Sequence, residues 1–258
     1  MSTPFAAALA AYGLHNCLVN DTTLWIGLDG RTATPNAQPL AAPPGPLRRV
    51  VFLEAPVQAD LVRALVASPQ VQTLDELFIG TAQAYPGRYS REAFPGYDMA
   101  QAVGALAGAH LPALRHLVLG DMEDLSGGFR LFGTVGDITP IFAAAPSLTT
   151  LGLYGNFALS APVRHRHLEV VETLFDTYGV TGEVITQETL DHLLASDLPA
   201  LRILALDMEE GGQEADRTLP DPFLALGHLP ALRQLEINRL TPDAAARLDR
   251  LKAARGLA

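Results

Sequence analysis

The residues that could support chemistry are scattered along this chain and form no motif of a known enzyme class. Cys17 is the single cysteine, and no spacing ties it to any of the seven histidines. The nucleophile turn G-x-S-x-G, the phosphate loop G-x-x-x-x-G-K, the zinc motif H-E-x-x-H and the dinucleotide fingerprint G-x-G-x-x-G are all absent. We therefore expect a non-catalytic protein without a cofactor. The alternative is an unrecognised enzyme or a metal-dependent protein.

Two histidines and several carboxylates are the residues that could bind a metal ion. His165 and His167 would place two imidazoles on one side of an extended segment, which is half of a metal site. No cysteine or clear third ligand lies nearby, so a surface or turn role is the other interpretation. The carboxylates lack the spacing of a calcium-binding loop. The sequence thus predicts no metal site.

Two segments, 81–97 and 120–136, combine aromatic side chains with arginine. Each follows an apolar segment directly, so we expect both to leave a sheet at the same edge and to lie side by side. Aromatic and arginine side chains are enriched at protein interfaces, which makes these insertions the first candidate for a partner site. The other interpretation is a small satellite core within the loops. The candidate residues are Tyr85, Arg88, Tyr89, Arg91, Phe94, Phe129 and Arg130.

Carboxylates gather just beyond the predicted strand ends and would form an acidic rim. Such a rim attracts basic proteins and speeds their association, so we expect a protein partner that is basic. The other interpretation is a solvated edge that maintains solubility. The rim residues are Asp121, Glu123, Asp124, Asp176, Asp207, Glu209, Glu210, Glu214 and Asp216.

Composition limits the classes of partner and of compartment. Hydrophobic residues make up 48% of the 258 residues and charged residues 18%, which is typical of a packed globular protein. A formal net charge of -10 argues against nucleic acid and anionic membranes, because both require a basic face. No apolar run is long enough to span a bilayer, and the first residues do not resemble a signal peptide. Together with the lone cysteine, these features favour the cytoplasm.

One apolar segment recurs three times almost unchanged and organises the chain. The copies are HLPALRHLVL at 110–119, LPALRILAL at 198–206 and HLPALRQLEI at 228–237. The spacing L-x-x-L-x-L predicts a strand with alternate leucines in one core. The same register places the second leucine of successive units at Val50, Leu77, Leu117, Leu151, Val171, Leu204 and Leu235.

The repeated motif and the segment APSLTTLGLYGN at 145–156 resemble the leucine-rich repeat family of the ribonuclease-inhibitor type. The segment 120–136 also resembles uncharacterised bacterial cytoplasmic leucine-rich repeat proteins. The resemblance covers residue 47 to the end and implies an α/β solenoid, or horseshoe, with a curved parallel sheet and outer helices. In this family a buried asparagine follows each strand, but only Asn156 occupies such a position here. We expect the turns to be stabilised in another way.

The resemblance and the register together suggest a function. Members of this family commonly recognise proteins, so we expect a non-catalytic interaction module, and an immunity or antitoxin-like inhibitor of a basic enzyme is one alternative. Side chains between the buried leucines would point outward on the concave face. The outward residues are Val118, Gly120, Gly152, Tyr154, Glu172, Leu174, Ala205, Asp207, Glu236 and Asn238.

Helices are predicted on the return paths between strands. A Thr-Pro or Asp-Pro pair before an apolar stretch marks helix starts at Pro4, Pro140, Pro222 and Pro242. Further helices are expected at 56–68, from a capping box at Asp98 and Gln101 to Gly108, and at 186–196. The interval from Leu151 to Val171 is too short for a helix and should return as extended chain. The segment 241–255 is predicted to be a capping helix.

The chain is expected to form one structural unit with two regions. Residues 1–46 form an N-terminal cap and a proline-rich loop, in which 22–28 is an edge strand and 30–46 carries five prolines. Residues 47–258 form the leucine-rich repeat domain with its C-terminal capping helix.

Overall fold

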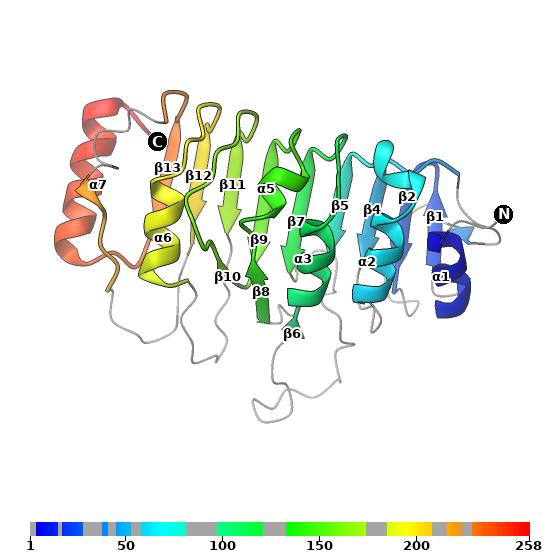
Figure 1. The fold of residues 1–258 in the computed structure, drawn as a ribbon. Coiled ribbons are helices and arrows are strands. Elements are labelled where there is room, and N and C mark those ends of the chain that lie inside the picture. Colours follow the sequence, from blue (N-terminus) through cyan, green and yellow to red (C-terminus); the bar gives the residue numbers. More distant parts are fainter. Residues whose placement is uncertain are drawn as a thin grey trace.

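A computed structural model describes residues 4–14, 17–27, 38–40, 45–52, 58–80, 97–120, 133–173, 185–207, 216–221, 223 and 229–258. The fold is mixed α/β, with a large and mostly parallel sheet (Figure 1). The helices are α1 Pro4–Tyr12, α2 Gln58–Val66, the 3-10 helix η2 Pro69–Gln72, α3 Ala100–Ala107, α5 Ile141–Ala144, α6 Gln187–Leu194 and α7 Pro242–Arg255. The strands are β1 Cys17–Asn20, β2 Thr23–Ile26, β3 Gln38–Pro39, β4 Arg49–Phe52, β5 Glu76–Ile79, β6 Tyr97–Asp98, β7 His116–Gly120, β8 Gly133–Asp137, β9 Thr150–Tyr154, β10 Asn156–Ala158, β11 Val170–Thr173, β12 Ile203–Leu206 and β13 Gln234–Ile237.

Among the described residues, the main sheet has ten strands in the order β13-β12-β11-β9-β7-β5-β4-β2-β1-β3. Every neighbouring pair from β2 to β13 is parallel. The predicted register is confirmed, because the seven residues assigned to equivalent positions are direct partners across the sheet. The ladder runs Val50, Leu77, Leu117, Leu151, Val171, Leu204 and Leu235, and each of these side chains is buried.

The N-terminal part of the sheet differs from the prediction. Strand β2 is not the edge, because β1 pairs with it antiparallel and β3 pairs with β1 beyond that. The turn between β1 and β2 holds Asp21 at φ 49°, a backbone region that aspartate tolerates because its short side chain can bond locally. Within the segment predicted to be loop, Gln38 and Pro39 form the edge strand, where the missing N–H of proline removes no ladder bond. Strands before residue 47 thus belong to the same sheet as strands after it.

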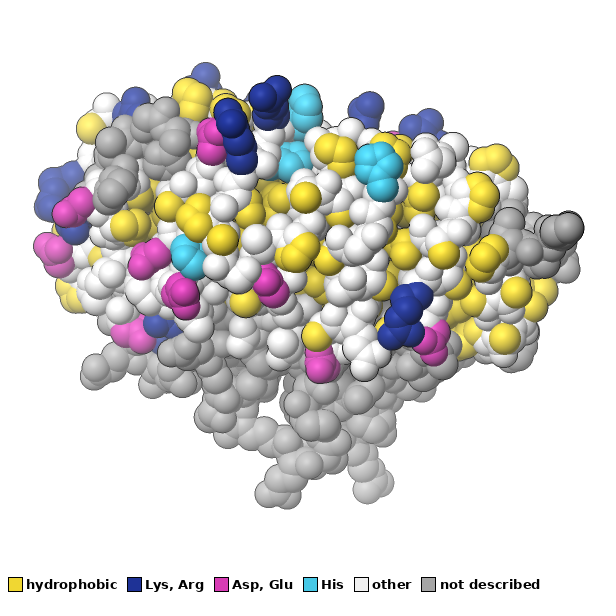
Figure 2. Space-filling view, in the orientation of Figure 1, with side chains coloured by type: hydrophobic (Ala, Val, Ile, Leu, Met, Phe, Trp, Pro, Cys, Tyr) yellow, Lys and Arg dark blue, Asp and Glu magenta, His cyan; other side chains and the backbone are white. Residues whose placement is uncertain are grey.

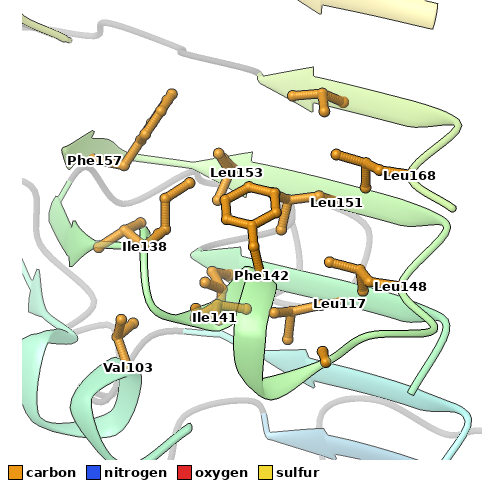
Figure 3. Packing of buried hydrophobic residues seen from close by; sticks show 14 of the residues in the cluster. Val103, Leu117, Ile138, Ile141, Phe142, Leu148, Leu151, Leu153, Phe157 and Leu168 are labelled. Carbon is orange, nitrogen blue, oxygen red and sulfur yellow. The ribbon is translucent and has the colours of Figure 1, made fainter. Parts of the chain in front are cut away.

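Helices α1, α2, α3, α5 and α6 lie against one face of the main sheet, and α7 lies beside the last strand (Figure 1). Leu61, Leu65, Leu106 and Leu190 from this layer share one buried cluster with the leucine ladder. Figure 3 shows the packing near the middle of the sheet, where Ile141 and Phe142 of α5 lie against Leu117 and Leu151. This cluster is the core of the protein.

The predicted N-caps are confirmed at α6 and α7 but not at α5, where the N-cap is Pro140 and Thr139 accepts a hydrogen bond from the backbone N–H of Ser160. Thr186 accepts a hydrogen bond from the backbone N–H of Thr189, and Thr241 accepts one from Ala244. The predicted capping box of α3 is not formed, because the N-cap is Met99, which makes no side-chain cap bond. Asp98 accepts from the backbone N–H of Ala100, and Gln101 accepts from Arg63. The Gln101 side chain bonds with α2 and not with the start of its own helix, because α2 and α3 are neighbours on the sheet. The predicted helix start at Pro222 lies outside the described residues.

Three short strands form a second parallel sheet in the order β10-β8-β6. Tyr97 of β6 is the partner of Gly133 of β8, so the ends of the two insertions lie side by side, as expected. The sheet itself was not predicted. Between β10 and β11 the chain returns without a helix, which confirms the prediction for this short interval.

The beginnings of the strands are joined by a repeated backbone arrangement. The carbonyl oxygen of the residue before one strand accepts two N–H groups from the next strand, as Arg48 does from Asp75 and Glu76. Asp75 accepts in the same way from Arg115 and His116. The same arrangement continues at Thr22, Arg115, Thr149, Glu169 and Arg202. These bonds connect adjacent turns at the end of the sheet where the strands begin. Asn156, which follows β9, is only half-buried in β10.

Candidate interaction surface

Most of the residues predicted to bind a partner lie outside the described residues. Tyr154 and Asp207 are described, and both are half-buried on the open face of the main sheet. Asp216 of the predicted rim is exposed and pairs with Arg217 at 3.2 Å. The residues outside the described part are Tyr85, Arg88, Tyr89, Arg91, Phe94, Asp121, Glu123, Asp124, Phe129, Arg130, Asp176, Glu209, Glu210 and Glu214.

One row of side chains crosses the face of the main sheet opposite the helix layer. Its members are cross-strand partners, and they alternate along each strand with the buried ladder. The outward positions predicted at Val118, Gly152, Glu172 and Ala205 are therefore confirmed. The row, which we call the open-face row, consists of Leu18, Trp25, Val51, Phe78, Val118, Gly152, Glu172, Ala205 and Glu236.

The half of the open-face row nearer the N-terminus is apolar. Val51, Phe78 and Val118 form a buried cluster separate from the main core. Half-buried Leu18, Trp25 and Tyr154 pack against this cluster. The sequence prediction began this row only at Val118 and did not extend it to the outward residues of the strands before it. The alternation of Leu24 and Ile26 around Trp25 could have shown that Trp25 points to the opposite face of the sheet.

A polar group borders this apolar half on the side where the strands begin. The Arg49 guanidinium carbon lies 4.5 Å from the centroid of the Phe78 ring, and Arg49 Nε lies 3.4 Å from Glu76 Oε2. The His116 ring meets the Phe78 ring edge-on with the centroids 4.9 Å apart. Burial lowers the pKa of His116, although the negative charge of Glu76 opposes this shift. Phe78 thus lies between one permanent cation and one imidazole.

The other half of the open-face row is acidic and accessible. Glu172 and Glu236 are exposed on β11 and β13, with half-buried Ala205 between them on β12. Gln234 donates a hydrogen bond to Glu236 at 2.8 Å. The carboxylate of Asp207 accepts a hydrogen bond from the side-chain amide of Asn238. The open face therefore changes from apolar to acidic along the sheet.

His165, considered above as half of a metal site, is buried and held by backbone groups. This side chain is 3% exposed, and its Nε2 lies 3.0 Å from the carbonyl oxygen of Ala145. Its Nδ1 accepts from the backbone N–H of Leu168 at 3.1 Å, so both ring nitrogens are occupied by backbone. Burial lowers the pKa of His165, which keeps the imidazole neutral. In the described part of the chain, no cluster of three His, Cys, Asp or Glu could hold a metal ion.

Cys17 is also placed for packing rather than for reaction. It is fully buried in β1, and burial raises the pKa of its thiol to about 11. A thiol that is protonated and enclosed is a poor nucleophile, because the thiolate is the reactive form. None of the helices within the described ranges is long and apolar enough to cross a membrane.

No family model matches this sequence, and no curated protein matches it. Among solved structures, the fold is similar to a crystal structure of a protein from Bacteroides fragilis, with 18% sequence identity and a TM-score of 0.41. The match covers 69% of this chain and 47% of the other, so it spans less than half of that protein's length. A similarity of this strength carries no argument about function.

Proposed function

We propose that this chain is a cytoplasmic leucine-rich repeat solenoid that binds a protein partner through the open face of its main sheet. The observation that carries the proposal is the open-face row, whose apolar half and acidic half are contiguous. Binding surfaces combine an apolar, aromatic centre with charged surroundings, and the open face offers half-buried Trp25 and Tyr154, packed against the cluster of Phe78, together with exposed Glu172 and Glu236.

The side chains of the open face indicate which class of partner would bind there. Glu172 and Glu236 favour positive charge, and Trp25 and Tyr154 favour apolar contact. The partner is therefore a basic protein with an apolar patch, and a basic enzyme that this chain inhibits would be one example. Electrostatic attraction would speed association and would weaken as salt rises, because both carboxylates are exposed. The insertions at 81–97 and 120–136 would add contacts from their aromatic residues.

The test compares partners captured by purified variants from a native lysate and then measures binding of the captured protein. Glu172→Lys and Glu236→Lys, made together, reverse two charges on the open face, while Glu188→Lys reverses one charge on the exposed side of α6. We expect a basic partner whose affinity for the open-face variant falls about tenfold or more. The α6 variant should bind like the natural protein.

Tyr154→Ala tests the apolar half of the same surface. We expect weaker binding without a change in salt dependence, because the substitution removes contact area and no charge. A captured protein that is acidic, or one that binds all three variants equally, would contradict the proposal.

A further inference from the structure

A second surface lies along the edge of the main sheet where the strands begin. A hollow of about 460 Å³ follows this edge and is lined by the turns that lead into β2, β4, β5, β7 and β9. Its lining includes Thr22, Pro46, Arg48, Asp75, Arg115 and Ser147. Neighbouring strands lie about 4.8 Å apart, so five strand beginnings span about 19 Å. An extended peptide of about six residues has this length.

The recurring motif supplies positive charge at this edge. Arginine follows the buried leucine of each L-P-A-L copy, at Arg115, Arg202 and Arg233. The shorter segment Pro46-Leu47-Arg48 places Arg48 at the same position before β4. Carboxylates occupy this position only at Asp75 and Glu169 among the described strands from β2 to β13. Figure 2 shows Lys and Arg side chains gathered along the upper edge of the molecule, where the strands begin.

Two of these arginines flank the hollow and share one carboxylate. Arg48 lies 3.1 Å from Asp75 Oδ2, and Arg115 lies 3.7 Å from Asp75 Oδ1. The side chains of Arg48 and Arg115 are 67% and 71% exposed, while that of Asp75 is 27% exposed. Two guanidinium groups therefore face solvent with a single compensating charge between them. Each guanidinium has five N–H donors and retains donors for a second carboxylate.

The wall of the hollow is held in place before any ligand arrives. The Gln70 side chain donates to the carbonyl oxygen of Gly45 and accepts from the backbone N–H of Leu47, so it holds both sides of Pro46. The Thr73 hydroxyl donates to the carbonyl oxygen of Leu47 at 2.9 Å. A surface that is fixed in advance loses little conformational entropy on binding.

We propose that this hollow binds an extended acidic peptide segment of a partner protein, with carboxylates of the segment paired to Arg48 and Arg115. Turn residues such as Pro46 and Pro112 provide apolar contact for the peptide backbone. A long nucleic acid fits less well, because it would extend beyond Arg48 and Arg115 over a chain with a net charge of -10, whereas a six-residue segment contacts the hollow alone. This surface lies on a different side of the sheet from the open-face row, so it does not depend on the proposed function.

The experiment measures fluorescence anisotropy of a labelled six-residue peptide rich in glutamate, with the glutamine version of the same peptide as control ligand. Arg48→Glu with Arg115→Glu should weaken binding about tenfold or more, because two charge-assisted contacts are lost. Arg202→Glu with Arg233→Glu makes the same change at the same strand position away from the hollow. Those two substitutions should change the affinity for the peptide less than about threefold, because they act only through long-range electrostatic attraction, which salt screens.

Asp75→Asn should strengthen peptide binding, whereas the arginine substitutions in the hollow weaken it. The substitution leaves the backbone bonds of residue 75 unchanged and frees Arg48 and Arg115 from their shared carboxylate. We expect affinity for the acidic peptide to rise about threefold, which is the scale of an exposed ion pair. A variant that merely misfolds could not show tighter binding.

Several results would overturn the proposal. If the protein bound the glutamate and glutamine peptides with equal affinity, charge would have no role in binding. If both pairs of arginine substitutions lowered the affinity equally, the hollow would not be the binding site. Tighter binding of a single-stranded oligonucleotide than of the peptide would assign the edge to nucleic acid. A dimer that dissociates on Arg48→Glu with Arg115→Glu would assign it to a second copy of the chain.

Discussion

Gly152 and Val118 are cross-strand partners on β9 and β7, and a Cβ atom added to Gly152 would lie 3.3 Å from Cγ2 of Val118. The same Cβ would lie 3.3 Å from Cε2 of the Tyr154 ring. Glycine thus leaves the space in which Tyr154 approaches the apolar cluster of Val51, Phe78 and Val118. This contact lies where the open face changes from apolar to acidic.

Gly152→Val should destabilise the protein by about 1–3 kcal/mol, because the added methyl groups would have to displace Val118 or the Tyr154 ring. Chemical denaturation measures the change. Gly104→Ala in α3 is the matched control, since no atom lies within 4 Å of its added Cβ, and it should stabilise by about 0.5–1 kcal/mol. A neutral Gly152→Val variant would contradict the close packing at this position.

Leu204→Ala should destabilise the protein by about 2–5 kcal/mol, because it opens a cavity in the leucine ladder between Val171 and Leu235. Leu204 is 1% exposed. The neighbouring Ala205 faces the other side of the sheet and is half-buried, so Ala205→Ser should change stability by less than about 0.5 kcal/mol. Urea unfolding of both variants distinguishes the two faces, and a loss below about 1 kcal/mol for Leu204→Ala would contradict the register.

Ser196→Ala should cost about 1–3 kcal/mol, because the backbone N–H of Val163 would lose its buried acceptor. Ser196 Oγ accepts from that N–H at 2.9 Å and donates to the carbonyl oxygen of His192 at 2.7 Å. The serine therefore ties the helix-free segment after β10 to the end of α6. Thermal unfolding measures the loss, and half-buried Ser147→Ala serves as a control with little effect.

Acid should weaken the fold through His165. Burial lowers the pKa of this imidazole below its ordinary value near 6.5, so the unfolded chain binds more protons in mild acid. The free energy of unfolding should therefore fall as pH drops from about 6.5 toward 5, and it should be constant above that range as far as this group is concerned. Burial lowers the pKa of His116 too, and its contribution has the same sign.

His165→Phe separates this effect from the loss of the two backbone hydrogen bonds. We expect the variant to be less stable than the natural protein at neutral pH and to lose less stability on acidification. Exposed His167→Gln should keep the original pH dependence. Urea unfolding across this pH range provides the measurement, and identical pH profiles for all three proteins would exclude His165 as a source of the acid sensitivity.

Local residue patterns were enough to predict the ladder of the main sheet. Leucines at alternate positions have one low-energy arrangement, in which they share a dry interior, so Leu117, Leu204 and Leu235 specify both register and face. Proline after threonine likewise specified the start of α7, since both side chains act within a single turn.

Which distant residues are neighbours at the surface depends on the folded arrangement of the strands. Leu18 and Trp25 extend the open-face row because β1 and β2 join the sheet, and no repeat in the sequence marks them. Thr22 and Ser147 line one hollow although 125 positions separate them, since stacking brings together turns whose separation depends on every intervening loop. Local patterns determine what a strand buries, but the order in which strands stack determines what the molecule presents to a partner.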